Sequence, residues 1–471
     1  MIQFGTGGWR AEIGKDFHRD NVRRIGQAMA NRIISEGVNQ TPVVIGYDRR
    51  FLSDSAAQWL AEVLAANGVP VYFLHRSAPT PLVMHTVMKM GLDYGMEVTA
   101  SHNPPTYNGI KIIVKEGRDA PVETTQALEA EIAKLSDEDI HVMPFDEAVA
   151  AGTITWLENP FNQFLDDILG VLDNEAIRKK GPRILFDTMH GSSTYPLMVI
   201  FYTDRCTLDL MNSNKDAYFG GMMPAPTAST LQELQHRVVA GGYDLGIGID
   251  GDGDRLGVID KDGTYIDANS ILVLLYYYLH EYKGWKGPVV RNLSTTHMLD
   301  RVAEALGEKC YEVPVGFKYI SSKIDEVDAV LGGESSGGLT VRGHIHGKDS
   351  VYASSLFVEM LCVTGKSAGE LLSELQEKYG KSVMESDNLA FPAEGKPRIL
   401  KTVMEDKIVP DFGAEVDHVG YMDGCKVYFK DGSFVSCRFS GTEPLLRIFA
   451  EASDSATARK YIDIWRTSLG M

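Results

Sequence analysis

One pattern occurs three times along this chain of 471 residues: a short apolar strand, an amphipathic helix and another apolar strand. The first copy contains a predicted helix at 20–37 with Asp20 as its N-cap, a strand at 43–48, a helix at 53–68 and a strand at 69–74. Two parallel strands joined by a crossover helix are the repeating unit of α/β sheets. The pattern therefore predicts three α/β domains that are built alike.

The second copy of the pattern runs from 183 to 255 and the third from 288 to 338. After about Tyr379 the alternation ends, and short strands at 425–430 and 434–440 are joined by the turn sequence DGS before a helix that starts near Ser453. The predicted fold class is α/β, with three similar mixed α/β sheet domains and a smaller C-terminal α+β domain. The predicted domains span residues 1–150, 151–258, 259–378 and 379–471.

Composition excludes several classes of function. The formal net charge of -18 disfavours nonspecific binding to nucleic acid, which depends on clustered Lys and Arg. The longest apolar run, 271–280, is too short to cross a bilayer, and the start of the chain lacks a signal peptide pattern. We expect a cytoplasmic protein with no nucleic-acid or membrane partner. The cysteines are scattered and odd in number, which predicts reduced thiols rather than a disulfide framework. They are Cys206, Cys310, Cys362, Cys425 and Cys437.

Each copy of the pattern ends in a polar or glycine-rich loop, which is where open parallel sheets place ligands. These loops carry Ser101, the cluster that starts at Asp250, and Glu334. In the segment TASHNPP, two prolines follow Ser101 and stop any helix, so the serine is expected on a rigid loop. The sequence contains neither the G-x-S-x-G elbow of hydrolases nor a P-loop motif, so an acyl-transfer triad is not supported.

Aspartates alternate with glycines in the segment GIDGDGDR. The glycines leave room for the three carboxylates to converge, and carboxylates that converge repel one another strongly unless a cation neutralises them. A calcium-binding EF-hand would need glycine at Arg255 and glutamate at Lys261. The cluster of Asp250, Asp252 and Asp254 is therefore predicted to bind Mg²⁺, with coordination positions left for a substrate or phosphoryl oxygen.

Two further segments carry groups suited to a phosphorylated sugar. RFSGTEPLLR supplies Arg438, Ser440, Thr442 and Arg447 around a glycine turn, a set of donors suited to a phosphate dianion. GGESSGG offers a carboxylate and hydroxyls that can bind neighbouring sugar hydroxyls. In RGHIHGKDS, Lys348 has a side chain able to donate or accept a proton, while the two histidines lack the further ligands of a zinc site. Together the segments indicate phosphoryl transfer through a phosphoserine to a sugar.

The four motifs, in this order, closely resemble those of the α-D-phosphohexomutase superfamily, the phosphoglucomutase/phosphomannomutase family, and the resemblance spans almost the whole chain. TASHNPP looks like the phosphoserine loop of the family, DGDGDR its magnesium loop, GESSG its sugar-binding loop and RFSGTEPLLR its phosphate-binding loop. FGTGGWR, residues 4–10, is similar to the N-terminal signature, with Gly7 where serine is common. The resemblance implies domains around a central cleft and interconversion of hexose 1-phosphate and hexose 6-phosphate through a bound hexose 1,6-bisphosphate, which also serves as activator.

The resemblance also implies roles for single residues. Ser101 would carry the phosphoryl group and join the three aspartates as a ligand of Mg²⁺. Arg10 and Arg255 would steady the phosphate. The implied acid/base groups are Lys111, Lys348 and His102. The groups implied to bind the sugar and its second phosphate are Glu334, Ser336, Arg438, Ser440, Gly441, Thr442 and Arg447.

The identity of the sugar depends on two positions of the sugar-binding loop. Ser335 matches none of the GEESG, GEMSG and GEQSG forms of glucose, mannose/glucose and glucosamine members, and Gly338 stands where the latter two types usually carry histidine. We therefore expect glucose, with mannose or dual specificity second and glucosamine third. A sugar-phosphate phosphatase and a noncatalytic sugar-phosphate sensor remain as other classes. The expected partners are small-molecule sugar phosphates, and the chain is expected to be a monomer or small homo-oligomer.

Overall fold

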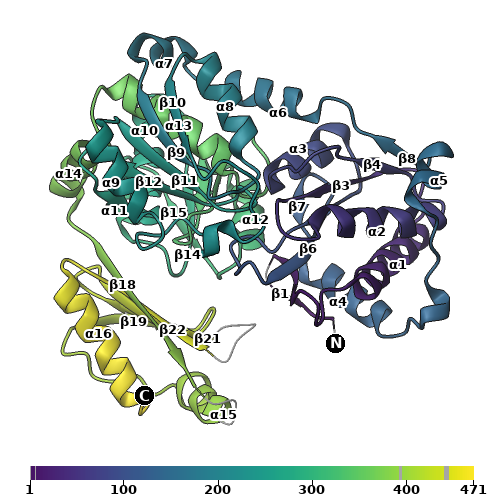
Figure 1. Ribbon diagram of the computed structural model, residues 1–471. Helices are drawn as coiled ribbons and strands as arrows, with labels where there is room; N and C mark the ends of the chain where they lie inside the picture. The colour runs from purple at the N-terminus through teal and green to yellow at the C-terminus, as the bar shows by residue number, and fades with distance from the viewer. Residues whose placement is uncertain (1, 6, 392–394, 440–444) are drawn as a thin grey trace. The chain divides into compact units, whose positions relative to one another are not determined.

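The computed structural model describes residues 2–5, 7–391, 395–439 and 445–471 (Figure 1). The chain forms two compact units, one made of residues 1–271 and 336–369 and the other of residues 272–335 and 370–471. Among the described residues, no helix combines the length and the apolar character that crossing a membrane requires.

The first unit begins with a mixed sheet in the strand order β1-β2-β6-β5-β3-β4-β8, with β7 beside β6. Strands β5, β3, β4 and β8 are parallel, whereas β6 is antiparallel to both β5 and β2. The strands are β1 (Phe4–Gly5), β2 (Gly8–Glu12), β3 (Val43–Tyr47), β4 (Val71–Phe73), β5 (Tyr94–Val98), β6 (Tyr107–Val114), β7 (Arg118–Asp119) and β8 (Ile154–Trp156). The helices are α1 (Arg19–Ser35), α2 (Ser53–Ala66), α3 (Thr80–Met90), α4 (Val122–Ile132) and α5 (Phe145–Ala150).

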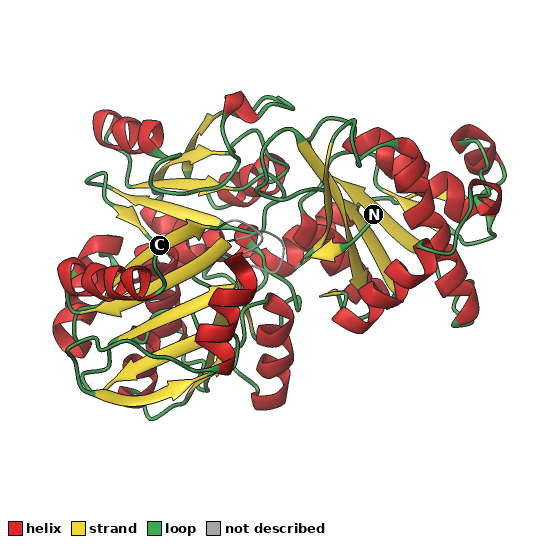
Figure 2. Ribbon diagram, turned by 90° about the horizontal axis from the view of Figure 1, so that it is seen from below, coloured by secondary structure: helices red, strands yellow, loops and turns green. Residues whose placement is uncertain are grey.

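Helices cover both faces of this sheet (Figure 2). Residues of α1 and α2 share one buried apolar cluster with Ile45 of β3, whereas Val83 of α3 packs over Gly46 on the opposite face. The prediction of Asp20 as the N-cap of α1 is wrong, because His18 holds that position. Asp20 lies in the first turn instead, where a carboxylate interacts favourably with the helix dipole.

The second sheet also belongs to the first unit and has the order β10-β9-β11-β12-β13. Strands β10, β9 and β11 are parallel, and β12 turns back antiparallel to β11. The loop 250–255 joins β11 to β12. The strands are β9 (Arg183–Asp187), β10 (Thr207–Met211), β11 (Leu245–Ile249), β12 (Leu256–Asp260) and β13 (Tyr265–Ile266), and the helices are α6 (Pro160–Leu169), α7 (Asn174–Lys180), α8 (Thr194–Thr203) and α9 (Gln232–Gly241). Strand β17 (Leu339–Val341) and helix α13 (Ser350–Thr364) complete the unit.

The second unit holds the parallel strands β15-β14-β16 and an antiparallel sheet in the order β18-β22-β21-β20-β19. Its strands are β14 (Val289–Asn292), β15 (Cys310–Val313), β16 (Leu331–Gly333), β18 (Val383–Ala390), β19 (Val416–Gly420), β20 (Cys425–Phe429), β21 (Phe434–Phe439) and β22 (Leu445–Ala452). Its helices are α11 (Met298–Ala305), α12 (Phe317–Val327), α15 (Lys396–Leu400) and α16 (Ser455–Ser468), and α10 (Ala268–Glu281) and α14 (Ala368–Tyr379) begin at the ends of the first unit. Three α/β sheets and an antiparallel C-terminal domain confirm the predicted fold class.

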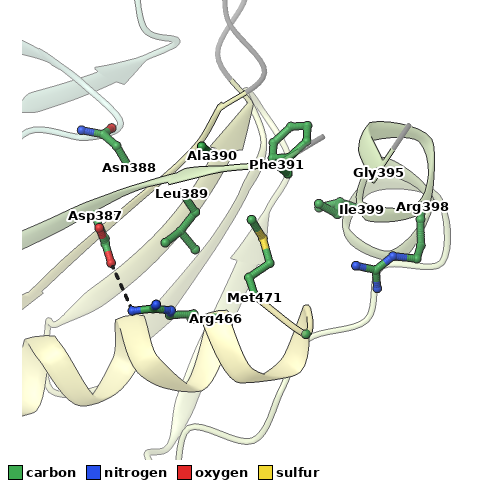
Figure 3. A pocket seen from close by; sticks show the side chains of 11 residues that line it. Asp387, Asn388, Leu389, Ala390, Phe391, Gly395, Arg398, Ile399, Arg466 and Met471 are labelled. Atoms are coloured by element: carbon green, nitrogen blue, oxygen red, sulfur yellow. Dashed lines mark ion pairs between the residues drawn. The ribbon is translucent and has the colours of Figure 1, made fainter. Parts of the chain in front are cut away.

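A cavity of about 530 Å³ lies in the antiparallel domain, between β18, α15 and the end of α16 (Figure 3). Arg466 of α16 forms an ion pair with Asp387 of β18 at its edge, and Arg398 donates a hydrogen bond to the carbonyl oxygen of Leu469. None of the described residues that line the cavity is a predicted site residue.

Candidate active site

Ser101 lies on the loop between β5 and β6, directly past the carboxyl end of a central strand. Its side chain is buried, and its backbone has a φ of 52°, in the left-handed region that costs roughly 1–2 kcal/mol for a residue other than glycine. Such strain persists only where neighbouring groups hold the backbone in place. Ser101 is therefore fixed by contacts outside its own loop.

Arg50, which follows β3, supplies those contacts. Its Nη2 atom donates to the carbonyl oxygens of Ser101 and Asn103, at 2.5 and 2.6 Å. Its Nη1 atom donates to the carbonyl oxygens of Pro104 and Tyr107, at 2.9 and 3.0 Å. One buried guanidinium thus holds four carbonyl groups of the serine loop.

Asp48 connects Arg50 to the backbone of the serine. Its Oδ2 atom lies 3.3 Å from Nε of Arg50 and accepts a hydrogen bond from Oγ1 of Thr99 at 2.7 Å, and Oγ1 of Thr99 accepts the N–H of Ser101 at 2.8 Å. Arg50 and Asp48 were not among the site residues predicted from the sequence. The available signal was the charged run DRR directly after the apolar strand β3, whose neighbour in the sheet is β5.

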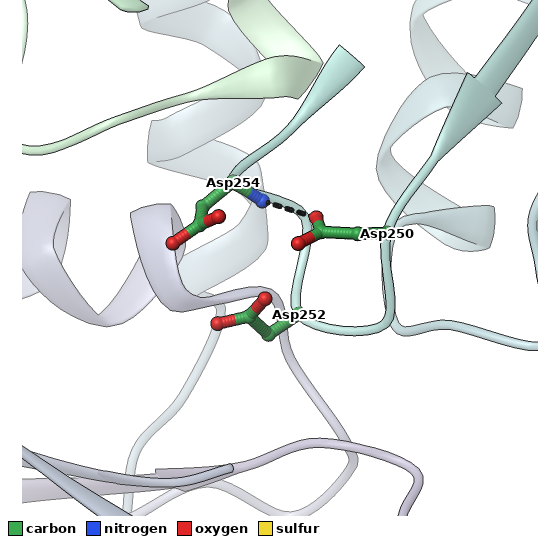
Figure 4. Close-up of side chains that lie close together, drawn as sticks. All are labelled: Asp250, Asp252 and Asp254. Carbon is green, nitrogen blue, oxygen red and sulfur yellow. Dashed lines mark hydrogen bonds between the residues drawn. The ribbon is translucent and has the colours of Figure 1, made fainter. Parts of the chain in front are cut away.

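The three predicted metal-binding aspartates converge in the loop after β11 (Figure 4), where one oxygen of each lies within 4.8 Å of the others. Each carboxylate uses its other oxygen to bind the protein. In Asp250, Oδ1 accepts the backbone N–H groups of 254 and 255 at 2.8 and 2.9 Å. In Asp252 and Asp254, Oδ2 accepts Nζ of Lys111 at 2.7 and 2.9 Å.

The second oxygen of each aspartate faces the centre of the cluster. Among the described residues, Oδ1 of Asp252 and Oδ1 of Asp254 are buried without a hydrogen-bond partner. From the described part of the chain, Oδ2 of Asp250 accepts only a long hydrogen bond of 3.3 Å, from Oγ of Ser101. A buried anionic oxygen without a partner is costly, and hard oxygen ligands are those that Mg²⁺ prefers. The residues therefore fit a Mg²⁺ ion bound by three carboxylates beside the serine hydroxyl.

The charges around the cluster set its protonation. Burial and repulsion from Asp252 and Asp254 raise the pKa of Asp250 well above its ordinary value. Burial also acts on Asp254, but Lys111 and Lys348 outweigh it and hold the pKa of Asp254 well below its usual range. A cation that binds here would favour the ionised form of Asp250 as well.

The structure places the six predicted catalytic side chains around this cluster, in the same unit. Nζ of Lys348 lies 2.9 Å from Oδ2 of Asp254, the oxygen that Lys111 also binds. Nδ1 of His102 lies 3.2 Å from Oγ of Ser101. Burial, together with Arg255 and Arg10, lowers the pKa of His102 well below its ordinary value, so its imidazole is neutral.

The two predicted phosphate-steadying arginines have different anchors. Nη1 of Arg10, on β2, donates to Oδ1 of Asn103 at 2.6 Å. Nε of Arg255 lies 3.8 Å from Oδ1 of Asp254, too far for a hydrogen bond. Both guanidinium groups keep a buried Nε that has no hydrogen-bond partner among the described residues, so each retains a donor for an anion.

A buried acid near the cluster was also not predicted from the sequence. Glu97 of β5 is opposite Lys111 of β6 in the sheet, and neither of its carboxyl oxygens has a hydrogen-bond partner among the described residues. Burial, Asp48 and Asp252 raise the pKa of Glu97 well above its ordinary value. A Cβ at Gly46 would lie 2.3 Å from Oε2 of Glu97, so glycine makes room for this neutral carboxyl group.

The predicted sugar- and phosphate-binding residues lie mostly in the second unit. Oε1 of Glu334, past the end of β16, accepts the side-chain amide of Asn292 and the N–H of Gly316, both at 3.2 Å. Arg438 of β21 is directly opposite Arg447 of β22. Nε of Arg438 also lies 2.7 Å from Oδ2 of Asp423, and two neighbouring guanidinium groups remain suited to bind a phosphate dianion. Ser336 belongs to the first unit and is exposed. Ser440, Gly441 and Thr442 lie outside the described residues.

Models of one protein family match almost the whole length of the chain. Residues 1–139, 162–263 and 267–379 match the models for phosphoglucomutase/phosphomannomutase alpha/beta/alpha domains I, II and III. Residues 397–466 match the model for the C-terminal domain of the same family.

Individual proteins also match nearly the whole length of this chain. A phosphoglucomutase/phosphomannomutase of Thermococcus kodakarensis is 30% identical over 98% of this chain and 97% of its own. A probable phosphoglucosamine mutase of Methanobrevibacter smithii is 30% identical over 97% of this chain and 96% of its own. The crystal structure of a putative phosphomannomutase from Thermus thermophilus superposes with a TM-score of 0.85 at 26% identity and covers 100% of this chain and 99% of that one.

Proposed function

Because the chain belongs to the phosphoglucomutase/phosphomannomutase family, within the α-D-phosphohexomutase superfamily, we propose that it interconverts hexose 1-phosphate and hexose 6-phosphate through a phosphoserine at Ser101. The observation that supports this most directly is the 3.3 Å separation of Oγ of Ser101 from Oδ2 of Asp250. It places a rigidly held hydroxyl beside a cluster of three carboxylates, and few reactions other than phosphoryl transfer need that combination.

In the proposed cycle, the phosphoryl group leaves Oγ of phospho-Ser101 for the free hydroxyl of a bound hexose 1-phosphate. The P–Oγ bond breaks, a P–O bond to the sugar forms, and the proton of the sugar hydroxyl moves to a base and then to Oγ of Ser101. The hexose 1,6-bisphosphate turns around, its other phosphoryl group returns to Ser101, and hexose 6-phosphate leaves. Hexose 1,6-bisphosphate thus phosphorylates a resting enzyme.

The chain's own residues have distinct proposed roles. Asp250, Asp252 and Asp254 would hold Mg²⁺, which when bound stabilises negative charge on the phosphoryl oxygens. Arg10 and Arg255 keep donors that can bind the same oxygens. These preorganised charges favour the transition state because they need no reorientation during transfer.

Three side chains could carry the proton. The neutral imidazole of His102, 3.2 Å from Oγ of Ser101, can accept one. Lys348 and Lys111 both contact Asp254, and Lys111 is the more restrained, since it also contacts Asp252. We therefore assign Lys111 chiefly to charge balance, and His102 and Lys348 to proton transfer.

For binding of the sugar phosphate we propose Glu334 and Ser336 as partners of the hydroxyls, and Arg438 and Arg447, with the segment 440–442, as partners of the phosphate that does not react. The opposed arginines of β21 and β22 support the phosphate site. Glucose is the sugar we propose, on the basis of the small residue at Gly338. Mannose and glucosamine are the other candidates, because relatives that are 30% identical are named a phosphoglucomutase/phosphomannomutase and a probable phosphoglucosamine mutase.

The test is the formation of hexose 6-phosphate from glucose, mannose and glucosamine 1-phosphates in parallel, with Mg²⁺ and a trace of glucose 1,6-bisphosphate. We expect turnover that depends on the bisphosphate, with glucose 1-phosphate the best substrate. Release of inorganic phosphate without isomerisation would identify a phosphatase instead. Tight binding of a sugar phosphate without either product would identify a sensor.

A further inference from the structure

The side chain of Lys348 passes directly over the Cα of Gly338 on its way to Asp254. A Cβ built on Gly338 would lie 2.1 Å from Cδ, 2.7 Å from Cγ and 3.3 Å from Cβ of Lys348. Carbon atoms that are not bonded make contact at about 3.5–4.0 Å. The methylene chain of Lys348 therefore occupies the space that any side chain at 338 would need.

The backbone on the Gly338 side of this contact has little freedom to move away. The carbonyl oxygen of Gly337 accepts the N–H of Leu256 at 3.2 Å, and the carbonyl oxygen of Leu339 accepts the N–H of Asp349 at 3.0 Å. The φ of Gly338 is outside the left-handed region, so a methyl group there meets no left-handed strain. A methyl group at 338 would thus be resisted by Lys348 and not by its own backbone.

The backbone that carries Lys348 is equally fixed. Oδ1 of Asp349 accepts the N–H groups of Val351 and Tyr352 at 2.8 and 3.0 Å and so caps α13. Oδ2 of Asp349 lies 2.7 Å from Nε2 of His344, and Nδ1 of His346 lies 3.0 Å from the carbonyl oxygen of Glu116. Since both backbones are held, the lysine side chain has to give way.

The position of the ammonium group depends on that side chain. Nζ of Lys348 lies 2.9 Å from Oδ2 of Asp254, and its side chain is 15% exposed. Nζ of Lys111 binds the same oxygen but is also held by Asp252 and, at 3.4 Å, by Thr80. Rotation of the Lys348 stem would therefore remove one cation from the aspartate cluster and leave the other in place.

We infer that Gly338 is a positioning residue for Lys348: the absence of a side chain at 338 is what lets the lysine deliver its ammonium group to Asp254. This inference deepens the proposed function and rests on it for its catalytic consequence. It also gives residue 338, within the predicted sugar-binding loop, a role that is independent of direct contact with the sugar.

A double-mutant cycle tests this inference. We expect Gly338→Ala and Lys348→Ala each to lower kcat by about 100-fold, the scale of one proton-transfer group, and the double variant to be no slower than Lys348→Ala. The pH profile of kcat should change in the same way in both single variants. Gly395→Ala is the control, because Gly395 has a φ of -78° and a Cβ there meets no atom within 4 Å, and it should keep the wild-type pH profile.

Several outcomes would overturn the inference. One is wild-type kcat in Gly338→Ala, and another is a double variant whose loss equals the product of the two single losses. A crystal structure of Gly338→Ala with Lys348 still on Asp254 would refute the inference even if no hexose phosphate is turned over. Absence of turnover in the wild-type protein would instead refute the proposed function, so the two failures are distinguishable.

Discussion

Arg50→Met is expected to loosen the loop that carries Ser101 while it keeps a side chain of similar length in the core. Arg50 is 1% exposed, and its guanidinium donates hydrogen bonds to the carbonyl groups at 101, 103, 104 and 107. Methionine has no donor, so these carbonyl oxygens lose their partner. The left-handed backbone of Ser101, with a φ of 52°, then has little to hold it.

The size of the effect follows from these contacts. A hydrogen bond to a charged group contributes about 1.5–3 kcal/mol, so the four bonds exceed the strain of roughly 1–2 kcal/mol at Ser101. Part of the free energy that these hydrogen bonds contribute offsets the cost of removing the guanidinium from water. Loss of one partner from such a buried network lowers the free energy of unfolding by about 3–5 kcal/mol, which we expect for Arg50→Met. A shift of the serine oxygen by about 1 Å would lower kcat by about 100-fold.

The assay measures kcat with Mg²⁺ and glucose 1,6-bisphosphate, the phosphorylation of Ser101 by intact mass, and unfolding in urea. Arg49→Met is the matched control, because Arg49 is only partly buried and donates one hydrogen bond, to the carbonyl oxygen of Ser213 at 3.0 Å. Wild-type kcat and stability in Arg50→Met would refute this reasoning. Equal losses in Arg49→Met would refute it as well.

Three further changes have defined outcomes. Ser101→Ala should abolish mutase activity and phosphorylation by the bisphosphate while circular dichroism stays unchanged, and retained activity would exclude the phosphoserine. Asp252→Asn should raise the Mg²⁺ concentration needed for half-maximal activity, because one anionic ligand is lost; an unchanged magnesium response would exclude the aspartate cluster as the metal site. Glu97 has a raised pKa in the folded state, so above about pH 4.3 the unfolded chain releases a proton that the folded protein keeps, and stability falls as pH rises. Glu97→Gln removes this slope, so as the pH rises above about 4.3 the free energy of unfolding of the variant should gain on that of the wild type, by at most about 1.4 kcal/mol per pH unit; parallel curves for variant and wild type would contradict the raised pKa of Glu97.

The elements that the sequence predicted well are those set by local periodicity. The helix expected at 53–68 is α2, Ser53–Ala66, and the strand expected at 425–430 is β20, Cys425–Phe429. Apolar spacing and the turn residues beside it are properties of neighbours in the chain, so they are visible in the sequence alone. The mistaken prediction of Asp20 as the N-cap of α1 shows the limit of such signals, because Asp20 lies only about half a helical turn after the actual N-cap, His18.

The residues that were missed act over long separations. Arg50 binds carbonyl groups more than 50 residues away, and Glu97 becomes meaningful only because the pairing of β5 with β6 puts it opposite Lys111. In the sequence, Glu97 is a single charge inside an apolar strand. The aspartate cluster could be predicted because its three carboxylates are close in the chain, and the opposed arginines because one motif contains both.

One oxygen of each aspartate is hydrogen-bonded to the protein and the other faces the cluster, and this affects how the site would bind and release cations. Hydrogen bonds from the loop's own N–H groups and from Lys111 fix the three carboxylates, so entry of an ion need displace none of these contacts. Binding and release are then separate from folding, unlike at sites where the metal organises the chain. We therefore expect the loop to act as a preformed chelator, whose occupant would follow the relative abundance and affinity of small divalent cations, Mg²⁺ and Mn²⁺ among them, in the surrounding solution.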